Sequence, residues 1–314
     1  MRKTALDMVH ELAQRDPRVL FIGSDLGAGT LDAFKREFPD RFFMEGVSEA
    51  NIIGMAGGLA MSGFIPYINT IAPFFTRRAL EQITIDLCLH KLPVRLIASG
   101  GGVVYAPLGP THLAFEDMAT LRAIPGMTVV APCDAPQMGR LMARTLDWPG
   151  PIYIRLAKGG DAVVSSPDEE FAIGKAITMR PAGAAMIVAT GTAVQRALAA
   201  AELLATRGIA CGVANMHTVK PLDDAAVLQW ADEVELLVTL EEHTLIGGLG
   251  GAVAELLVDR HAAPPRLLRL GLPDAFPKEY GSQESMMDSF GLAPAAVAAR
   301  IAETLEGVAA RKRR

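Results

Sequence analysis

Several features that define common protein classes are scarce in this chain or missing from it. Only three cysteines occur among 314 residues, and their spacing forms no pairs, which favours reduced thiols over a disulfide framework. No run of about 18 uncharged apolar residues exists, so no membrane span is predicted. The N-terminus turns polar too quickly for a secretory signal peptide. We therefore expect a cytoplasmic protein without a membrane partner.

Motifs for several chemistries are also missing. The net charge is −5, so the chain lacks the basic surface that nucleic-acid binding requires. No two histidines lie at metal-ligand spacing, and we expect no metal site on this chain. A Walker A loop and a G-x-S-x-G elbow are both missing. A glycine-rich turn at 247–251 follows a predicted strand, but its spacing departs from the dinucleotide-binding pattern and favours close helix packing.

The sequence does contain enough apolar residues for two cores. Hydrophobic residues make up 50% of the chain and charged residues 21%, and the length suggests two domains of about 150 residues each. Short apolar runs alternate with helical patterns, which is typical of parallel sheets covered by helices on both faces. A polar segment near 159–170 interrupts this alternation. We predict two three-layer α/β modules with mostly parallel sheets, one over residues 1–165 and one over 166–314.

The expected elements follow from the apolar periodicity. In the first half, strands are predicted at 20–22, 42–44, 94–98, 128–131 and 152–154, and helices at 3–14, 49–62, 74–89, 114–123 and 135–146. In the second half, strands are predicted at 186–189, 212–214, 236–239 and 266–269, and helices at 192–207, 223–231 and 248–260.

Unusual residues follow the predicted strands of the first half. They are Asp25, Glu49, a triple glycine at 100–102, His112 and Arg155. Ligands of open α/β sheets bind outside the carboxyl ends of the strands. These positions therefore form the candidate site.

Glu49 begins a helix that is otherwise apolar and rich in glycine. An acid in a first helical turn is usually there because it interacts favourably with the helix dipole. Here the apolar surroundings predict burial, and a buried carboxyl is costly unless it has a partner. Gly54, Gly57 and Gly58 leave a surface that another backbone can approach closely, so we expect a subunit contact there.

Two histidines stand at positions where a structural or a functional role is open. His112 stands in the loop Gly109-Pro110-Thr111-His112, and a lone histidine is more often structural than catalytic. His243 ends a predicted strand in Glu241-Glu242-His243 and is harder to assign to structure alone. The short basic run at 311–314 fits a solvated tail.

Taken together, the motifs resemble those of the transketolase family. The resemblance runs from Arg2 to about Gly271 and covers only that family's pyrimidine-binding and C-terminal domains. The matching segments are Met44-Glu45-Gly46-Val47-Ser48-Glu49-Ala50-Asn51, Gly57-Gly58-Leu59-Ala60, Gly63-Phe64-Ile65-Pro66-Tyr67, Gly109-Pro110-Thr111-His112 and Val219-Lys220-Pro221-Leu222-Asp223.

The resemblance implies a cofactor and a partner. In that family thiamine diphosphate lies between two domains, and one of them holds the diphosphate through Mg²⁺ with a G-D-G motif. This chain has no G-D-G, so the resemblance implies a split transketolase whose N-terminal half is a separate subunit that holds the metal. We expect a heterotetramer with two copies of each chain, because oligomers favour closed symmetry.

The resemblance also implies roles for single residues. Glu49 matches the glutamate that hydrogen-bonds the pyrimidine nitrogen and allows the cofactor's own imino group to remove the thiazolium proton. Phe75, or its neighbour Phe74, matches an aromatic residue stacked on the pyrimidine. Asp25 matches an acid on the cofactor side.

On the substrate side, His112 matches a histidine near the sugar hydroxyls. Arg2 and Arg155 match arginines that bind a sugar phosphate, for which a guanidinium fork is well shaped. Leu108 stands where the family usually has an aspartate that binds a donor hydroxyl, which implies a donor with fewer hydroxyls.

The predicted function is a subunit of a thiamine-diphosphate-dependent transketolase-like enzyme. It transfers a ketol or acyl unit from a ketose or 2-oxo acid to an aldehyde. One alternative is the beta chain of the decarboxylating component of a 2-oxoacid dehydrogenase, against which the G-P-T-H segment and Arg2 argue. Deoxyxylulose-phosphate synthase is also close, but it is normally one longer chain. Another alternative is a non-catalytic assembly subunit, in which a buried Glu49 would only cost stability.

Overall fold

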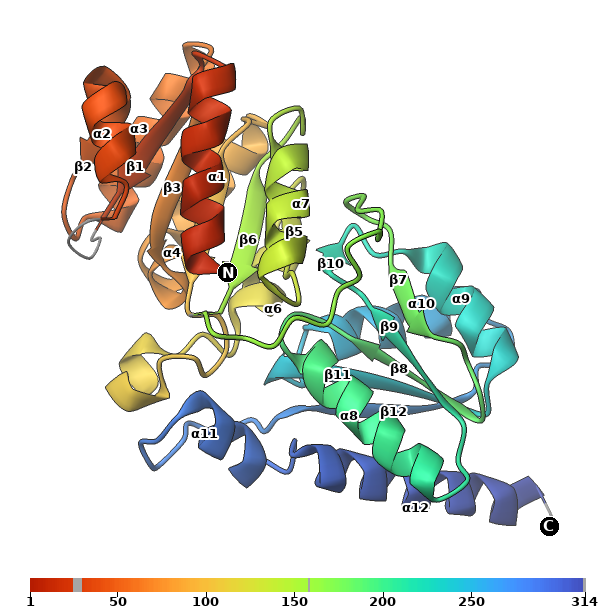
Figure 1. The fold of residues 1–314 in the computed structure, drawn as a ribbon. Coiled ribbons are helices and arrows are strands. Elements are labelled where there is room, and N and C mark those ends of the chain that lie inside the picture. The colour runs from red at the N-terminus through yellow and green to blue at the C-terminus, as the bar shows by residue number, and fades with distance from the viewer. Residues whose placement is uncertain (25–29, 158, 313–314) are drawn as a thin grey trace.

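The computed structural model describes residues 1–24, 30–157 and 159–312. They form two α/β domains, each built on one mostly parallel sheet with helices on both faces (Figure 1). The predicted fold class is therefore confirmed. In the described part of the chain, no helix is both long and apolar enough to cross a membrane.

The sheet of the first domain has seven strands in the order β10-β5-β6-β4-β3-β1-β2. All neighbouring strands are parallel except β10, which pairs antiparallel with β5. The strands are β1 Val19–Gly23, β2 Phe42–Met44, β3 Ile65–Ile71, β4 Arg95–Ser99, β5 Thr128–Val130, β6 Ile152–Leu156 and β10 Thr218–Lys220.

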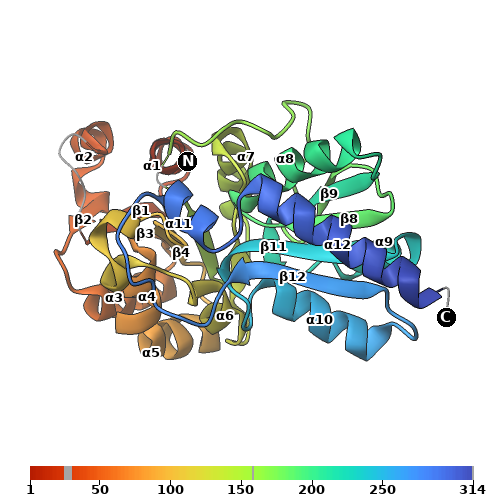
Figure 2. The same cartoon turned by 90° about the horizontal axis from the view of Figure 1, so that it is seen from below.

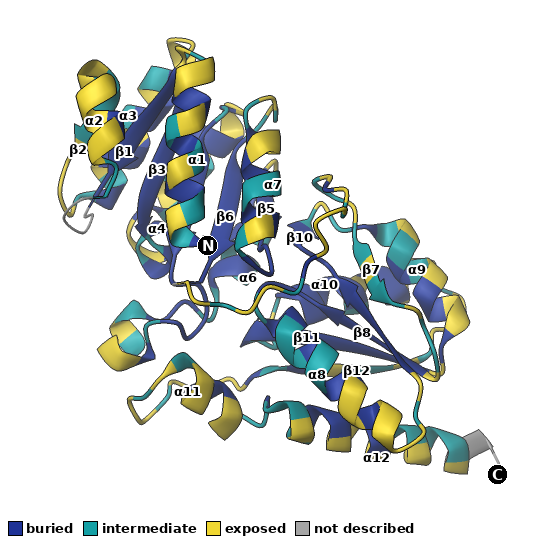
Figure 3. Ribbon diagram, in the orientation of Figure 1, coloured by how far each residue is buried: buried dark blue, intermediate teal, exposed yellow. Residues whose placement is uncertain are grey.

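Helices cover both faces of this sheet. α1 and α7 pack on one face, and α3, α4 and α6 pack on the other. The central strands are buried along their whole length, which explains their continuous apolar sequences (Figure 3). The helices are α1 Arg2–Arg15, α2 Asp32–Glu37, α3 Glu49–Met61, α4 Ala72–Arg78, α5 Leu80–Gln82, α6 Asp117–Arg122 and α7 Ala135–Thr145, with a π-helical segment at Ile83–Leu89 and 3₁₀ turns at Pro39–Arg41, Ala106–Leu108 and Pro110–His112.

The sheet of the second domain has five strands in the order β12-β11-β8-β9-β7, and only β7 is antiparallel. Its strands are β7 Ile177–Arg180, β8 Ala185–Ala189, β9 Cys211–Asn215, β11 Leu236–Thr244 and β12 Arg266–Leu272. Its helices are α8 Ala193–Thr206, α9 Asp224–Glu233, α10 Leu249–Arg260, α11 Gln283–Ser289 and α12 Pro294–Lys312.

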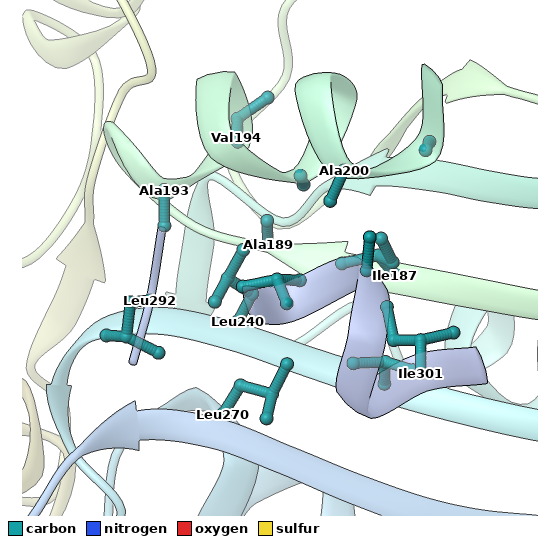
Figure 4. Packing of buried hydrophobic residues seen from close by; sticks show 14 of the residues in the cluster. Ile187, Ala189, Ala193, Val194, Ala200, Leu240, Leu270, Leu292 and Ile301 are labelled. Carbon is teal, nitrogen blue, oxygen red and sulfur yellow. The ribbon is translucent and has the colours of Figure 1, made fainter. Parts of the chain in front are cut away.

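The core of the second domain lies on both sides of its sheet. Figure 4 shows Ile187, Leu240 and Leu270 of the sheet packed against Ile301 of α12. The opposite face is covered by α9 and α10. Burial of these apolar faces holds the helices on the sheet.

The two domains are joined by more than the connecting segment. β10 comes from the second half of the sequence but adds a strand to the sheet of the first domain. The segment between β12 and α11 extends over the first domain (Figure 2), where the Phe276 ring lies 5.7 Å from that of Phe115. The two domains are therefore linked by a shared sheet and by side-chain packing as well as by the chain itself.

Candidate functional site

A cavity of about 180 Å³ opens at the carboxyl ends of β1, β3 and β4. From β1 the chain moves outward to β2 at the sheet edge, and from β3 it moves the other way to β4, so β1 and β3 flank the point where the strand order reverses. Such a switch point is where open α/β sheets bind ligands. The cavity is lined by Arg2, Ser24, Val47, Glu49, Asn69, Thr70, Ile71, Phe74, Ser99 and Tyr105.

Glu49 lies in the wall of this cavity and is only 3% exposed. It is the first residue of α3, where a carboxylate interacts favourably with the helix dipole. The Thr70 hydroxyl donates to Glu49 Oε1 at 3.3 Å, and Ser24 Oγ donates to Thr70 Oγ1 at 2.7 Å. These hydroxyls hold the carboxylate at the cavity.

Arg78 binds the other oxygen of Glu49. Its Nη1 donates to Glu49 Oε2 at 3.2 Å, while the Arg78 side chain remains 46% exposed. An ion pair with one partner this exposed is worth only about 0–1 kcal/mol. The carboxylate therefore has one buried partner and one weakly held partner, which it can exchange for a ligand.

The structure separates the two phenylalanines proposed for stacking. Phe74 lines the cavity, and the guanidinium carbon of Arg78 lies 3.7 Å from the centre of its ring. Phe75 is fully buried in the core, with its ring 6.4 Å from that of Tyr153. Only Phe74 is placed to contact a ligand in the cavity.

His112 lies beside the cavity rather than in its wall. Its ring and the Phe74 ring make an edge-on contact with their centres 5.4 Å apart, and its Nδ1 is 2.9 Å from Thr111 Oγ1. Arg77 supports this loop by donating to the Leu113 carbonyl at 2.9 Å. Leu108, earlier in the same loop, is 50% exposed and lies outside the lining.

The two arginines predicted to bind phosphate occupy different places. Arg2 lines the cavity. Arg155 does not, because its Nε donates to Asp117 Oδ2 at 2.8 Å and its Nη2 donates to the carbonyls of Ala114 and Glu242. Arg155 is only 6% exposed. Its guanidinium makes contacts between the two domains, and the phosphate-binding role of Arg155 stays a prediction.

Asp25, the remaining cofactor-side prediction, lies outside the described residues. Among the residues that are described, no group of three or more His, Cys, Asp or Glu side chains is arranged to hold a metal ion.

Polar residues of β3 and β4 were missed by the sequence reasoning. Asn69 Nδ2 donates to the Ile97 carbonyl at 2.8 Å and to Ser99 Oγ at 3.1 Å. Together with Thr70, these groups form the floor of the cavity. The signal for them is a polar Asn-Thr pair near the end of the short segment 65–71, which the pattern of apolar runs does not predict as a strand.

Comparison with known proteins identifies two family domains in the chain. Residues 1–160 match the family model described as "Transketolase, pyrimidine binding domain", and residues 174–297 match "Transketolase, C-terminal domain".

Two curated relatives illustrate how the match extends. A "6-deoxy-6-sulfo-D-fructose transketolase subunit SqwH" from Clostridium sp. (strain MSTE9) is 40% identical over 293 residues, covering 93% of this chain and 90% of that protein. A "1-deoxy-D-xylulose-5-phosphate synthase" from Synechococcus sp. (strain JA-2-3B'a(2-13)) is 40% identical over 296 residues, covering 93% of this chain but 45% of that protein. The chain thus spans nearly all of one relative and about half of the other.

A solved structure agrees with this match. It is titled "Split gene transketolase, inactive beta4 tetramer" and superposes with a TM-score of 0.89 at 35% identity, covering 97% of this chain and 98% of that one.

Proposed function

The chain belongs to the transketolase family, and from this premise we propose that it is one subunit of a split, thiamine-diphosphate-dependent transketolase-like enzyme. The proposed reaction transfers a ketol or related acyl unit from a ketose or 2-oxo acid donor to an aldehyde acceptor. The observation that carries the proposal is the buried Glu49 carboxylate in a cavity that also presents Phe74.

The residues of the cavity fit the aminopyrimidine of thiamine diphosphate. Phe74 offers an aromatic ring for stacking, and Glu49 offers a carboxyl that can hold a proton against a ring nitrogen. The cavity, at about 180 Å³, is smaller than the roughly 300–1,000 Å³ of complete small-molecule sites. This size supports a site that a second chain completes.

The chemical role of Glu49 is proton sharing. When bound, thiamine diphosphate supplies a carbon nucleophile that attacks the carbonyl of the donor. Glu49 would share a proton with the pyrimidine nitrogen and so favour the imino tautomer needed for activation. Burial strengthens this hydrogen bond because water cannot compete for the carboxyl.

The substrate side of the proposal rests on Arg2, His112 and Leu108. Arg2 places a positive charge at the cavity, which favours an anionic donor. His112, whose ring contacts that of Phe74, would hold substrate hydroxyls. Leu108 offers an apolar side chain in that loop and favours a donor with fewer hydroxyls there. The sulfo sugar in the name of the Clostridium relative is consistent with an anionic ketose.

A partner chain would carry the G-D-G motif, Mg²⁺ and the diphosphate-binding residues. The surface around α3 is suited to an interface because it exposes large apolar side chains, and two of its glycines, Gly54 and Gly58, are also exposed. Gly57 is buried, and a Cβ there would lie 3.5 Å from the Asp86 carbonyl oxygen, so the backbone that approaches this glycine belongs to the same chain. The exposed apolar residues are Met44, Val47, Met61, Ile85 and Leu89.

Assembly with the partner is proposed as a heterotetramer with two copies of each chain. The "inactive beta4 tetramer" of the split-gene relative is compatible with a chain that associates with its own copies when the partner is missing.

The first experiment measures cofactor binding by calorimetry. The chain co-purified with a G-D-G partner should bind Mg²⁺-thiamine diphosphate, and the chain alone should bind it weakly or not at all. Micromolar, magnesium-dependent binding by the chain alone would contradict the split-site proposal.

The second experiment tests Glu49 directly. Glu49→Gln fills the same space but cannot exchange a proton, so hydrogen–deuterium exchange at the thiazolium carbon of the bound cofactor should slow by about 10²–10⁴-fold. Glu202→Gln, at an exposed position of α8 in the second domain, is the matched control and should exchange like the unmodified protein. An unchanged rate in Glu49→Gln would remove Glu49 from the mechanism.

A further inference from the structure

Two sequence features have no role in the function proposed above. They are the triple glycine at 100–102 and the segment Glu241-Glu242-His243. The structure brings them together where the domains meet, because β11 ends beside the loop that follows β4. We call residues 99–105 the glycine loop.

The glycines are needed because other side chains occupy the space beside them. A Cβ at Gly102 would lie 2.5 Å from Glu242 Oε1, and one at Gly101 would lie 2.5 Å from Arg155 Cγ. A Cβ at Gly100 would overlap the Tyr105 ring. Gly100 and Gly102 also have φ angles of +77° and +67°, which favour glycine. The glycine loop is therefore shaped around fixed neighbours.

Glu242 is the neighbour that comes from the second domain. Its side chain is 3% exposed, and its Oε1 accepts a hydrogen bond from the Val103 amide at 2.7 Å. Its Oε2 accepts from Gln283 Nε2 at 2.7 Å and from Thr192 Oγ1 at 3.0 Å. Three donors thus hold the Glu242 carboxylate in one orientation. Because the carboxylate is fixed, its hydrogen bond also fixes the position of the Val103 amide.

Further contacts hold the Glu242 backbone on the first domain. Arg155 Nη2 donates to the Glu242 carbonyl at 2.8 Å, and Arg155 is itself paired with the buried Asp117. His243 Nε2 accepts from the Ala119 amide at 3.2 Å. The Thr244 amide also donates to the Phe115 carbonyl at 2.9 Å. The end of β11 is therefore anchored to the first domain through the consecutive residues Glu242, His243 and Thr244.

The glycine loop connects this anchor to the cavity. Ser99 at its start and Tyr105 at its end both line the cavity, whereas the described lining contains no residue of the second domain. Val103 lies between them, and its carbonyl accepts the Ala106 amide at 2.9 Å in the turn that places Tyr105. Moving the Val103 amide would displace the cavity wall.

We propose that Glu242 is a positioning residue, through which the second domain fixes the glycine loop and thereby the wall of the cofactor cavity. Glu242 itself does not line that cavity. The contacts of Glu242 do not depend on the proposed function, and only the measurement of cofactor binding rests on it.

The chain alone tests the structural part by hydrogen–deuterium exchange and mass spectrometry. In Glu242→Ala the Val103 amide loses its acceptor, and exchange in the peptide covering the glycine loop should rise about tenfold or more. Glu242→Gln keeps an oxygen for that amide and should stay within about threefold of the unmodified chain. Unchanged exchange in Glu242→Ala would overturn the proposal.

Glu241→Ala is the matched control for loss of stability. Glu241 precedes Glu242 on β11 and is 0% exposed, but its carboxylate accepts the amides of Leu249 and Gly250 at the start of α10. Its removal should destabilise the second domain without changing exchange in the glycine loop. Equal acceleration in both alanine variants would mean general loosening and would refute a specific role for Glu242.

The complex with a G-D-G partner tests the functional part. Glu242→Ala should raise the dissociation constant of Mg²⁺-thiamine diphosphate about tenfold, as loss of a supporting contact does in other preorganised sites, whereas Glu242→Gln and Glu241→Ala should not. If the unmodified complex binds no cofactor, the proposed function fails and the exchange result alone decides the role of Glu242. If the unmodified complex binds the cofactor and the Glu242→Ala complex binds it equally well, the positioning role is wrong.

If Glu242→Ala does not fold, Gly102→Ala provides a second test. The added methyl group meets Glu242 Oε1 and the residue keeps an unfavourable positive φ, so the loop must move while Glu242 remains. The same weakening of cofactor binding is expected, and normal affinity in this variant would contradict the proposal.

Discussion

The clearest stability prediction concerns His217, which precedes the strand that the second domain adds to the first. Its side chain is 0% exposed, and its ring stacks on Phe171 with the ring centres 4.1 Å apart. Burial lowers the pKa of His217 from 6.5 to about 4, against smaller opposing effects of the Lys175 backbone and the Asp223 charge. The folded protein therefore holds this ring neutral at pH 5.

The sign and size of the effect follow from these two pKa values. The unfolded chain binds the proton more readily, so the stability contributed by neutral His217 falls as the pH decreases through 6.5 towards 4. At pH 5 the unfolded His217 is about 1.5 pH units below its pKa of 6.5, and each unit corresponds to about 1.4 kcal/mol of unfolding free energy. We expect His217 to remove about 2 kcal/mol of unfolding free energy between pH 7.5 and pH 5.

Other buried groups also change stability with pH, so the unmodified protein must be compared with a variant that lacks His217. Burial lowers the pKa of His243 to about 4, which acts in the same direction, whereas burial raises the pKa of Glu241 to about 7, which stabilises the folded state as the pH falls. His217→Phe keeps an aromatic ring against Phe171 and removes this titration. It also removes the hydrogen bond between His217 Nδ1 and Thr218 Oγ1, and the difference between the two pH values cancels that constant loss. Urea unfolding of both proteins at pH 7.5 and pH 5 should show a pH dependence about 2 kcal/mol smaller in the variant. An identical dependence would refute the assignment.

Three further predictions concern the site and the assembly. Phe75→Ala should lower the unfolding free energy by about 3–5 kcal/mol because it empties a core position, whereas Phe74→Ala should cost little stability and weaken cofactor binding by the complex. Urea unfolding measures the first effect and calorimetry the second, and the reverse pattern would show that the stacking residue is Phe75. Leu108→Asp should raise kcat/KM for xylulose 5-phosphate, and an unmodified enzyme that already uses this donor as efficiently as an ordinary transketolase would contradict the role of Leu108. Mass measurement of the reconstituted pair should give two copies of each chain, and a stable one-to-one pair would contradict the proposed assembly.

Much of the fold could be predicted because most strands are buried on both faces. Such strands appear as short apolar runs, as in 94–98 and 186–189, and the structure has β4 and β8 there. β3 is not predicted because Pro66, Asn69 and Thr70 interrupt its apolar character, although it lies inside the sheet between β4 and β1. Those polar residues are in the strand because its end forms the cavity.

Long-range pairing was not available from the sequence. β10 has only three residues, and nothing local to 218–220 indicates that its partner is β5, almost ninety positions earlier. The ion pair of Arg155 with Asp117 is also non-local, because 38 positions separate the two residues. A family motif could suggest a phosphate-binding arginine, but only coordinates show where its guanidinium is already committed.

The placement of the candidate site residues was partly predictable. Glu49, Phe74 and Arg2 were named from motifs, and the structure places all three on one cavity; their functions stay predictions. The choice between Phe74 and Phe75 depends on the rotation of a short helix, which a one-residue uncertainty in register reverses.

The shared sheet limits how this protein can be dissected or recombined. A fragment ending near residue 165 would lack β10 and leave the outer edge of β5 with unpaired backbone groups. Such an exposed strand edge promotes aggregation. Grafting the second domain onto the first domain of a homologue would likewise demand a matching edge strand and a matching Glu242 contact. The unit that can be exchanged between proteins, or expressed for study, is the whole two-domain chain.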